Sequence, residues 1–222
     1  MTVADASSFG RPLWGDVLDE LREGIVTGAL GPGQRLVEHE IATEFGISRG
    51  PVRSAIAQLH RLGLVTVSPR RGAEVVVFER SDVIELFELR EALEVLALER
   101  AARIEGSVIA HLRSVVARGV EAHRNHDYRT SVEANLGFHR ELCHLSGNGR
   151  LIDAWETQAE QIRALTYAAQ RVDPVRVRPV MHTHETILQA LADGDIDLAK
   201  ESLRRHLRAA RDLLVTSDDS DA

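Results

Sequence analysis

The chain has 222 residues, of which 44% are hydrophobic and 27% are charged, and its formal net charge is −7. This is the composition of a globular protein with a substantial core, and Cys143 is the one cysteine, so collagen-like, wholly disordered and disulfide-held proteins are excluded. The first twenty residues lack a signal-peptide pattern, and no apolar run approaches the roughly 20 residues of a membrane span, so we expect a cytoplasmic protein without membrane contact.

The N-terminal third of the chain predicts three helices and then a β-hairpin. Apolar residues recur at three- and four-residue steps in the first helix, and Ser48 and Pro51 are typical of the start of the third. Two runs of β-branched residues flank the turn-forming segment Ser-Pro-Arg-Arg-Gly. The expected helices are 13–30, 38–45 and one from 48, and the expected strands are 64–67 and 73–78. A lone hairpin is marginal in water, so we expect it to pack on the helices in one module over 13–78.

The rest of the chain predicts an all-helical bundle over 79–215. Helical periodicity is broken by short polar or glycine-rich segments and by the stretch from Pro174 to Pro179, which we interpret as a loop. The breaks bound six helices, at approximately 82–104, 107–126, 128–145, 149–171, 180–193 and 197–215. We therefore expect a mainly α protein with two domains. Residues 1–12 and the acidic segment 216–222 are expected to be disordered.

The two predicted modules differ in charge. Between residues 46 and 76 there are five arginines and one acid, which gives a local charge of +4. Residues 79–222 carry 19 basic and 25 acidic side chains, or −6. A short basic segment on an acidic body is typical of a small module that meets a polyanion, attached to a larger module with another role.

The arginines of the basic module favour binding to nucleic acid. Arg49 and Arg53 are four residues apart and so share one helix face, beside the apolar stripe rather than on it. A helix placed in the major groove can offer such arginines to guanine or to phosphates. Arg70 and Arg71 at the hairpin tip suit a wing that reaches the neighbouring minor groove or backbone. The alternative is that these arginines form an ordinary solvated face.

Residues 35–76, RLVEHEIATEFGISRGPVRSAIAQLHRLGLVTVSPRRGAEVV, resemble the winged helix-turn-helix of GntR-type bacterial transcription regulators. The Ser-Arg-x-Pro-Val-Arg core of that family is intact over 48–53. The resemblance implies DNA contacts from the recognition helix, from the helix before it and from the wing. The implied contact residues are His39, Ser48, Arg49, Gly50, Arg53, Arg71 and Gly72. His39 stands where the family often has arginine.

The helical half resembles the FCD ligand-binding domain of the FadR-like branch of the same family. The segments 88–102, 135–151 and 184–207 carry this resemblance, which extends over nearly all of 79–215. Six helices are typical of the VanR-type subgroup, whereas the FadR type has seven. The resemblance implies a homodimer that binds a pseudo-palindromic operator in double-stranded DNA and responds to a metabolite.

Several histidines of the helical half are candidates for metal ligands. Asn135 and His139 lie four residues apart on one helix face, while His184 and His206 lie on two other helices. From spacing alone, a surface or hydrogen-bonded core role is the better interpretation of each histidine. FCD domains with a metal place Asp-x-x-x-His and two further histidines at these positions, so the resemblance implies a divalent metal site. The four ligands would suit zinc, with nickel or manganese as alternatives.

Asn135 replaces the aspartate of the family and is neutral, so such a site keeps the full positive charge of its ion. That charge favours an anionic ligand, and we expect a small carboxylate effector in the open coordination position. Arg90 matches an arginine that faces the effector in this family, and its guanidinium suits a carboxylate. The alternative for Arg90 is a structural ion pair with a neighbouring glutamate.

The catalytic motifs of the chain are incomplete. His184 and Glu185 begin like the His-Glu-x-x-His motif of zinc proteases, but Leu188 stands in place of the second histidine. There is no Gly-x-Ser-x-Gly motif and no phosphate-binding loop. We therefore expect a metabolite-responsive transcription regulator, such as a repressor, and not an enzyme. The alternatives are a metal-dependent enzyme with a vestigial DNA-binding module, and a constitutive DNA-binding protein whose bundle only dimerises.

Overall fold

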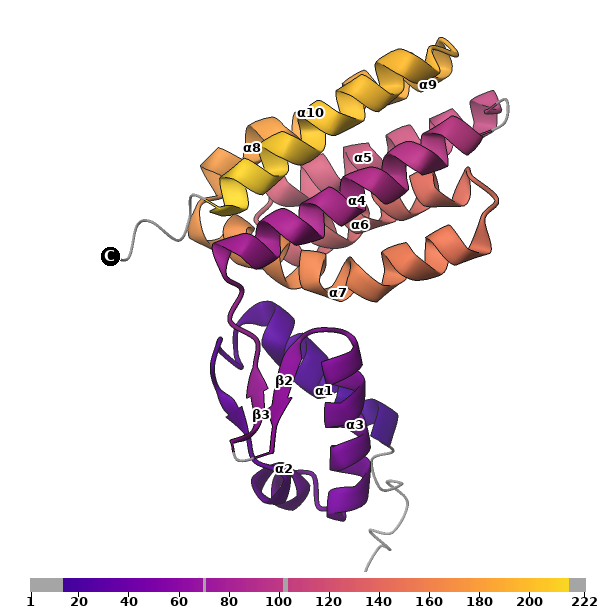
Figure 1. Cartoon of the computed structure of the whole chain (residues 1–222). Helices are drawn as coiled ribbons and strands as arrows, with labels where there is room; N and C mark the ends of the chain where they lie inside the picture. The colour runs from indigo at the N-terminus through magenta and orange to yellow at the C-terminus, as the bar shows by residue number, and fades with distance from the viewer. Residues whose placement is uncertain (1–13, 70, 102–103, 216–222) are drawn as a thin grey trace, which may run out of the picture. The chain divides into compact units, whose positions relative to one another are not determined.

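The computed structural model describes residues 14–69, 71–101 and 104–215 of the chain (Figure 1). The chain divides into two compact units, Met1–Val77 and Phe78–Ala222. The segments expected to be disordered, 1–12 and 216–222, lie outside the described residues, and so does Arg70 at the hairpin tip.

In its described residues, the first unit combines three helices with a small antiparallel sheet. Its elements are α1 (Trp14–Thr27), β1 (Arg35–Leu36), α2 (Glu38–Glu44), α3 (Arg49–Arg61), β2 (Val65–Ser68) and β3 (Gly72–Val75). Strand β3 pairs antiparallel with both other strands, so the sheet order is β1-β3-β2. The hairpin β2–β3 confirms the prediction. Strand β1 was not expected, because a strand of two residues has no detectable periodicity.

Helix α3 packs by the apolar face that its sequence pattern predicts. Val52, Ile56 and Leu59 are buried there, and α1 and β2 pack against α3. This burial fixes the rotation of the helix about its axis. Arg49 and Arg53 are consequently exposed to solvent.

The second unit is a helical bundle, as expected, with seven helices among its described residues. They are α4 (Arg80–Arg100), α5 (Gly106–Arg124), α6 (Tyr128–His144), α7 (Gly149–Val172), α8 (Pro174–His182), α9 (His184–Ala192) and α10 (Ile196–Val215). Figure 1 shows α4 and α10 running side by side, and the two helices contact each other along the bundle. Within the described ranges, none of the helices combines the length and apolar character that crossing a membrane requires.

The expected number of six helices is wrong, because the stretch from Pro174 to Pro179 is helical and not a loop. Pro174 is the first residue of α8, a position where its missing N–H leaves no hydrogen bond unmade. The Asp173 side chain caps the helix by accepting a hydrogen bond of 3.0 Å from the Arg176 backbone N–H. An Asp-Pro pair that we interpreted as a break is therefore a helix start. The assignment to the VanR-type subgroup loses its support, since it rested on six helices.

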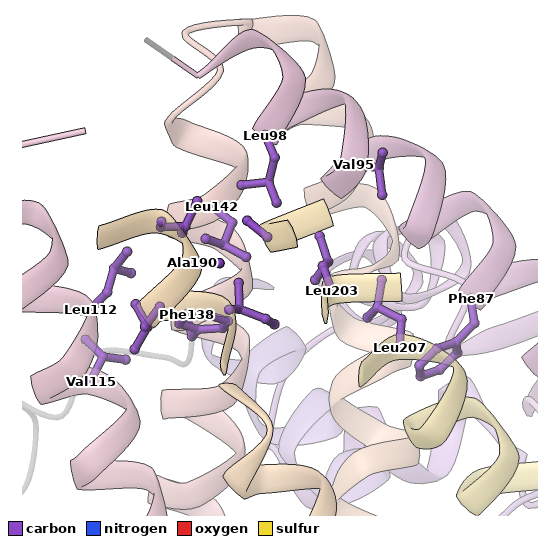
Figure 2. Close-up of a cluster of buried hydrophobic side chains, with 14 of the residues drawn as sticks. Phe87, Val95, Leu98, Leu112, Val115, Phe138, Leu142, Ala190, Leu203 and Leu207 are labelled. Carbon is purple, nitrogen blue, oxygen red and sulfur yellow. The ribbon is translucent and has the colours of Figure 1, made fainter. Parts of the chain in front are cut away.

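Apolar side chains from all seven of these helices meet in the centre of the bundle, and Figure 2 shows part of this cluster. The labelled members are Phe87, Val95, Leu98, Leu112, Val115, Phe138, Leu142, Ala190, Leu203 and Leu207. Helices α5 and α6 approach closely where α5 has Gly119, since a Cβ at that position would lie 2.9 Å from the Ala134 Cβ. This core fixes α4, α6, α9 and α10, the helices that carry the polar groups described next.

Candidate DNA-binding surface and candidate metal centre

The N-terminal half of α3 presents a polar, basic face. Ser48 is the N-cap residue of the helix, and Ser48 and Gly50 are both exposed. The side chains of Arg49 and Arg53 are 61% and 68% exposed. The structure thus brings together, at one end of one helix, the four residues expected there.

Both arginines are held by one carboxylate on the preceding helix. Arg49 Nη2 donates to Glu38 Oε2 at 3.1 Å. Arg53 donates from Nε to Oε1 at 3.1 Å and from Nη2 to Oε2 at 3.0 Å. The hydrogen bond from Arg53 holds the pKa of Glu38 below its usual value, and Arg49 acts in the same direction. Glu38 is therefore a charged anchor for both guanidinium groups.

Sequence reasoning missed Glu38, although it lies within the segment 35–76 that carries the resemblance. The remaining expected contact residues lie in α2 and in the turn before β3. His39 is exposed on α2, next to Glu38 in the chain. Arg71 is exposed in the turn, and Gly72 begins β3 with φ +80°, a backbone conformation that favours glycine. The wing therefore exposes Arg71 at its tip.

Three of the four expected metal ligands meet inside the bundle. His139 of α6, His184 of α9 and His206 of α10 are 0%, 3% and 3% exposed. His139 Nε2 lies 3.1 Å from His206 Nε2 and 3.3 Å from His184 Nε2. In the described part of the chain, these side chains form the one group of potential metal ligands whose atoms all lie within 4.8 Å of one another. Packing of three helices therefore builds the cluster.

Partners on the far side of two rings orient their Nε2 atoms toward the centre. His139 Nδ1 lies 2.7 Å from Glu94 Oε2 of α4, and a carboxylate oxygen accepts from an Nδ1–H. His206 Nδ1 lies 2.6 Å from the Thr183 hydroxyl, which can accept in the same way. Rings protonated at Nδ1 direct their Nε2 lone pairs at each other. Lone pairs at this separation repel unless a cation or a proton lies between them.

The cluster fits a divalent cation. Ligands about 2.0–2.1 Å from one tetrahedral zinc ion are separated by about 3.3 Å, close to the two measured distances. Burial lowers the pKa of His139 well below its usual value, and the nearby Arg90 and His184 act in the same direction. The ring is therefore neutral, the form of histidine that binds metals.

Asn135, the fourth expected ligand, is partly buried and lines a cavity next to the cluster. Arg90, His184 and His206 line the same cavity, which has a volume of about 40 Å³. The other lining residues are Phe87, Thr166, Ala169, Gln170, Val177, Ala210, Leu213 and Leu214. The structure therefore brings the expected effector arginine and the expected amide ligand to the same cavity as two of the histidines.

Arg90 and Glu94 form a buried ion pair beside this cavity. Their side chains are 2% and 0% exposed, and Arg90 Nε donates to Glu94 Oε1 at 2.7 Å. Trp155 Nε1 donates to the same oxygen at 2.9 Å. Burial raises the pKa of Glu94, whereas these donors stabilise its charged form. Arg90 Nη2 is buried and, among the described residues, has no hydrogen-bond partner, so the ion pair leaves one donor nitrogen unsatisfied.

Cys143 follows His139 by four residues on α6 and is buried. Burial raises the pKa of its thiol, so the thiolate form that binds metals or attacks substrates is not populated at neutral pH.

Comparison with known proteins gives one family for each unit. Residues 13–75 match bacterial regulatory proteins of the gntR family, and residues 85–209 match the FCD domain. The chain is 32% identical to an uncharacterized HTH-type transcriptional regulator from an unstable DNA locus of Streptomyces ambofaciens, over 93% of this chain and 87% of that protein. It is 30% identical to a probable D-xylose utilization operon transcriptional repressor of Paenarthrobacter nicotinovorans, over 83% and 81% of the two chains.

Another relative is the HTH-type transcriptional repressor RspR of Escherichia coli, 27% identical over 94% of this chain and 91% of the relative. Among solved structures, a transcriptional regulator GntR from Rhodococcus sp. RHA1 superimposes with a TM-score of 0.78 over 91% of this chain and 97% of its own, at 24% identity. The E. coli protein McbR/YncC gives a TM-score of 0.74 at 21% identity, over 93% and 98% of the two chains. Both structures share the fold.

Proposed function

The chain belongs to the GntR family of bacterial regulatory proteins and carries an FCD domain, and from this premise we propose that it is a repressor that binds a pseudo-palindromic operator as a homodimer and responds to a small carboxylate. Its relatives are transcriptional regulators and not enzymes.

The first unit binds DNA by inserting α3 in the major groove. Arg49 and Arg53 present their guanidinium groups to guanine or phosphate, and Ser48 with the first backbone N–H groups of α3 reaches a phosphate. Arg71 and Gly72 bring the wing to the neighbouring backbone or minor groove, and His39 contacts DNA from α2. The exposure of both arginines, 61% and 68%, supports this assignment.

The homodimer follows from the size of the reading surface. One α3 helix touches only a few base pairs, and a single small module seldom reaches useful specificity. Two modules related by two-fold symmetry read two half-sites about 34–36 Å apart, which is the reason that the operator is pseudo-palindromic.

The second unit holds a divalent metal ion, for which zinc is our first choice and nickel or manganese the alternatives. His139, His184 and His206 would bind it through Nε2, and Asn135 would add a neutral oxygen ligand. A bound ion would supply a positive charge and an open coordination position for an anion. The convergence of three buried Nε2 atoms, at 3.1 and 3.3 Å, is the observation that carries this part of the proposal.

The effector is a small carboxylate that binds between the metal and Arg90. Histidines bind a metal as neutral imidazoles, and the Arg90–Glu94 ion pair has no net charge, so a bound divalent ion would leave the cavity positive. Among the described residues Arg90 Nη2 is buried without a hydrogen-bond partner, which suits a carboxylate oxygen that reaches it. A cavity of about 40 Å³ holds about three water molecules, which limits the effector to a few non-hydrogen atoms unless the bundle opens.

Elemental analysis tests the metal, and a DNA-binding assay tests the response. We expect about one zinc, nickel or manganese ion per chain in freshly purified protein, and none in a His139→Ala/His184→Ala variant. A wild-type protein that binds no divalent ion would contradict the metal site. Operator binding that no carboxylate changes would instead support a constitutive DNA-binding protein.

A further inference from the structure

Glu94 is the buried charge at the centre of the second unit. It lies on α4, its side chain is 0% exposed, and it contacts side chains of both candidate ligand sites. No part of the proposed function assigns it a role beyond the ion pair with Arg90. Burying a carboxylate in a core costs free energy unless hydrogen bonds and an opposite charge compensate for the lost hydration.

The two oxygens of Glu94 are divided between the two sites. Oε1 accepts hydrogen bonds from Arg90 Nε at 2.7 Å and from Trp155 Nε1 at 2.9 Å. Oε2 lies 2.7 Å from His139 Nδ1. One rigid group thus touches both the arginine that faces the cavity and the histidine in the middle of the cluster.

We propose that Glu94 is a positioning residue for both candidate ligand sites. This inference rests on the proposed function, and it assigns two tasks to one side chain. Oε2 fixes the tautomer of His139 that can bind a metal, and Oε1 fixes the arginine that receives the effector.

The first task follows from the donor and acceptor roles of the groups. Arginine and indole nitrogens only donate, so Oε1 is an acceptor toward both of its partners. The guanidinium of Arg90 and the indole N–H of Trp155 both stabilise the ionised form of Glu94, which can only accept, so His139 carries its proton on Nδ1 and keeps the Nε2 lone pair free. Carboxylate partners act in this way on metal-binding histidines, by fixing the tautomer and the orientation of the ring.

The second task follows from the direction of Arg90. Its Nε donates to Oε1, whereas Nη2 has no partner in the described part of the chain, and Arg90 lines the cavity with His184 and His206. Glu94 therefore orients the arginine as well as His139.

The substitution Glu94→Gln separates charge from shape. A glutamine has nearly the same size, but one of its two terminal atoms is a donor. Its oxygen best faces Arg90 and Trp155, which only donate, so its NH₂ group faces His139 Nδ1. That nitrogen must then accept, the proton moves from Nδ1 to Nε2, and the position needed by the metal is blocked.

Two measurements test this inference. Nitrogen-15 NMR of the histidine rings in metal-free protein reports the tautomer, with His139 identified from the signal that a His139→Gln variant lacks. We expect the Nδ1–H form in the wild type and the Nε2–H form in Glu94→Gln. Zn²⁺ titration against a chromogenic chelator at constant pH should show about 10- to 100-fold weaker binding in the variant, the usual effect of removing such a partner.

Glu91→Gln is the matched control. It removes one carboxylate from the same helix, where Glu91 lies 3.7 Å from Arg204 and from Arg208 and touches no histidine of the cluster. We expect wild-type affinity for Zn²⁺ in this control. The double variant Arg90→Met/Glu94→Gln carries no unpaired buried charge, so it tests the same point if the single variant does not fold.

The outcomes separate this inference from the proposed function. Wild-type protein without affinity for Zn²⁺ contradicts the proposed metal site. An Nε2–H tautomer of His139 in the metal-free wild type overturns the role of Glu94, and so does a folded Glu94→Gln or double variant that binds Zn²⁺ as tightly as the wild type.

Discussion

Replacing both arginines of the recognition helix α3 is the most informative change on the DNA side. In Arg49→Ala/Arg53→Ala, two side chains that are 61% and 68% exposed are shortened, and the apolar face of α3 is untouched. Exposed substitutions of this kind usually change the free energy of unfolding by no more than about 0.5 kcal/mol. The variant should therefore fold and dimerise like the wild type.

The expected loss of DNA affinity is large. A bidentate contact between arginine and guanine contributes about 1–3 kcal/mol of discrimination, and two arginines in each of two protomers give roughly 4–12 kcal/mol. The lower end already corresponds to about a 10³-fold change in Kd. Specific binding typically exceeds non-specific binding by about 10³–10⁷-fold, so the double variant should lose its preference for the operator. Glu38 also keeps its charge after both partners are lost, which adds repulsion from phosphate.

Fluorescence anisotropy measures this loss directly. The wild-type protein first selects its preferred duplex from a random library, and both proteins are then titrated against that duplex and a scrambled one at about 150 mM salt. Arg22→Ala is the control, because Arg22 pairs with Asp19 on α1 and not with Glu38. A double variant that still prefers the selected duplex would refute the assignment of α3 as the recognition helix.

Three further predictions concern single residues. Glu38→Gln should tighten binding to scrambled DNA, because a negative charge is removed, and weaken binding to the selected duplex, because both recognition-helix arginines lose their anchor. Glu40→Gln on the same helix should keep the wild-type preference for the selected duplex. Fluorescence anisotropy with both duplexes distinguishes the two variants. Arg90→Met leaves a buried carboxylate without its counter-charge, so urea denaturation should show a loss of about 3–5 kcal/mol, and an unchanged midpoint would contradict the buried ion pair. Gly119→Ala places a Cβ 2.9 Å from a side chain of α6 and should destabilise the bundle by about 1–3 kcal/mol. In the control Gly137→Ala the nearest atom lies 3.9 Å from the new Cβ, so stability should not change. Equal thermal stability of the two variants would contradict the close approach of α5 and α6.

Sequence patterns predicted those helices and strands whose apolar periodicity and terminal residues all lie within one segment. The apolar stripe of Val52, Ile56 and Leu59 specified both the helix and its buried face, and the outward direction of Arg49 and Arg53 followed from it. The same local rules also explain why α8 was predicted as a loop. Asp-Pro occurs in turns and at helix starts alike, and only the capping hydrogen bond of Asp173 distinguishes the two for α8.

The site was less accessible to sequence reasoning, because its residues lie far apart in the chain. Spacing places Asn135 and His139 on one helix face, but nothing in the spacing brings His184 and His206 to them. Family resemblance supplied that grouping, and the packing of α6, α9 and α10 accounts for it physically.

Glu94 and Glu38 were missed for a related reason. Glutamates on helices are usually solvated, and their roles appear only when their partners are placed. Glu94 follows Arg90 by one helical turn, so the sequence allowed an ion pair but did not show that His139 and Trp155 complete its shell. Glu38 precedes Arg49 by eleven residues, and the turn between α2 and α3 brings them together.

Whether a small acid alters binding to the operator is the most direct test of the proposed function. Zn²⁺-loaded protein should be titrated against the selected duplex with and without a panel of two- to four-carbon carboxylates. We predict that at least one acid changes the Kd by about 5- to 150-fold, the range of a typical coupling between two sites, and that scrambled DNA is bound weakly throughout. An affinity for the selected duplex that no acid in the panel changes would contradict the account, and so would equal affinity for both duplexes.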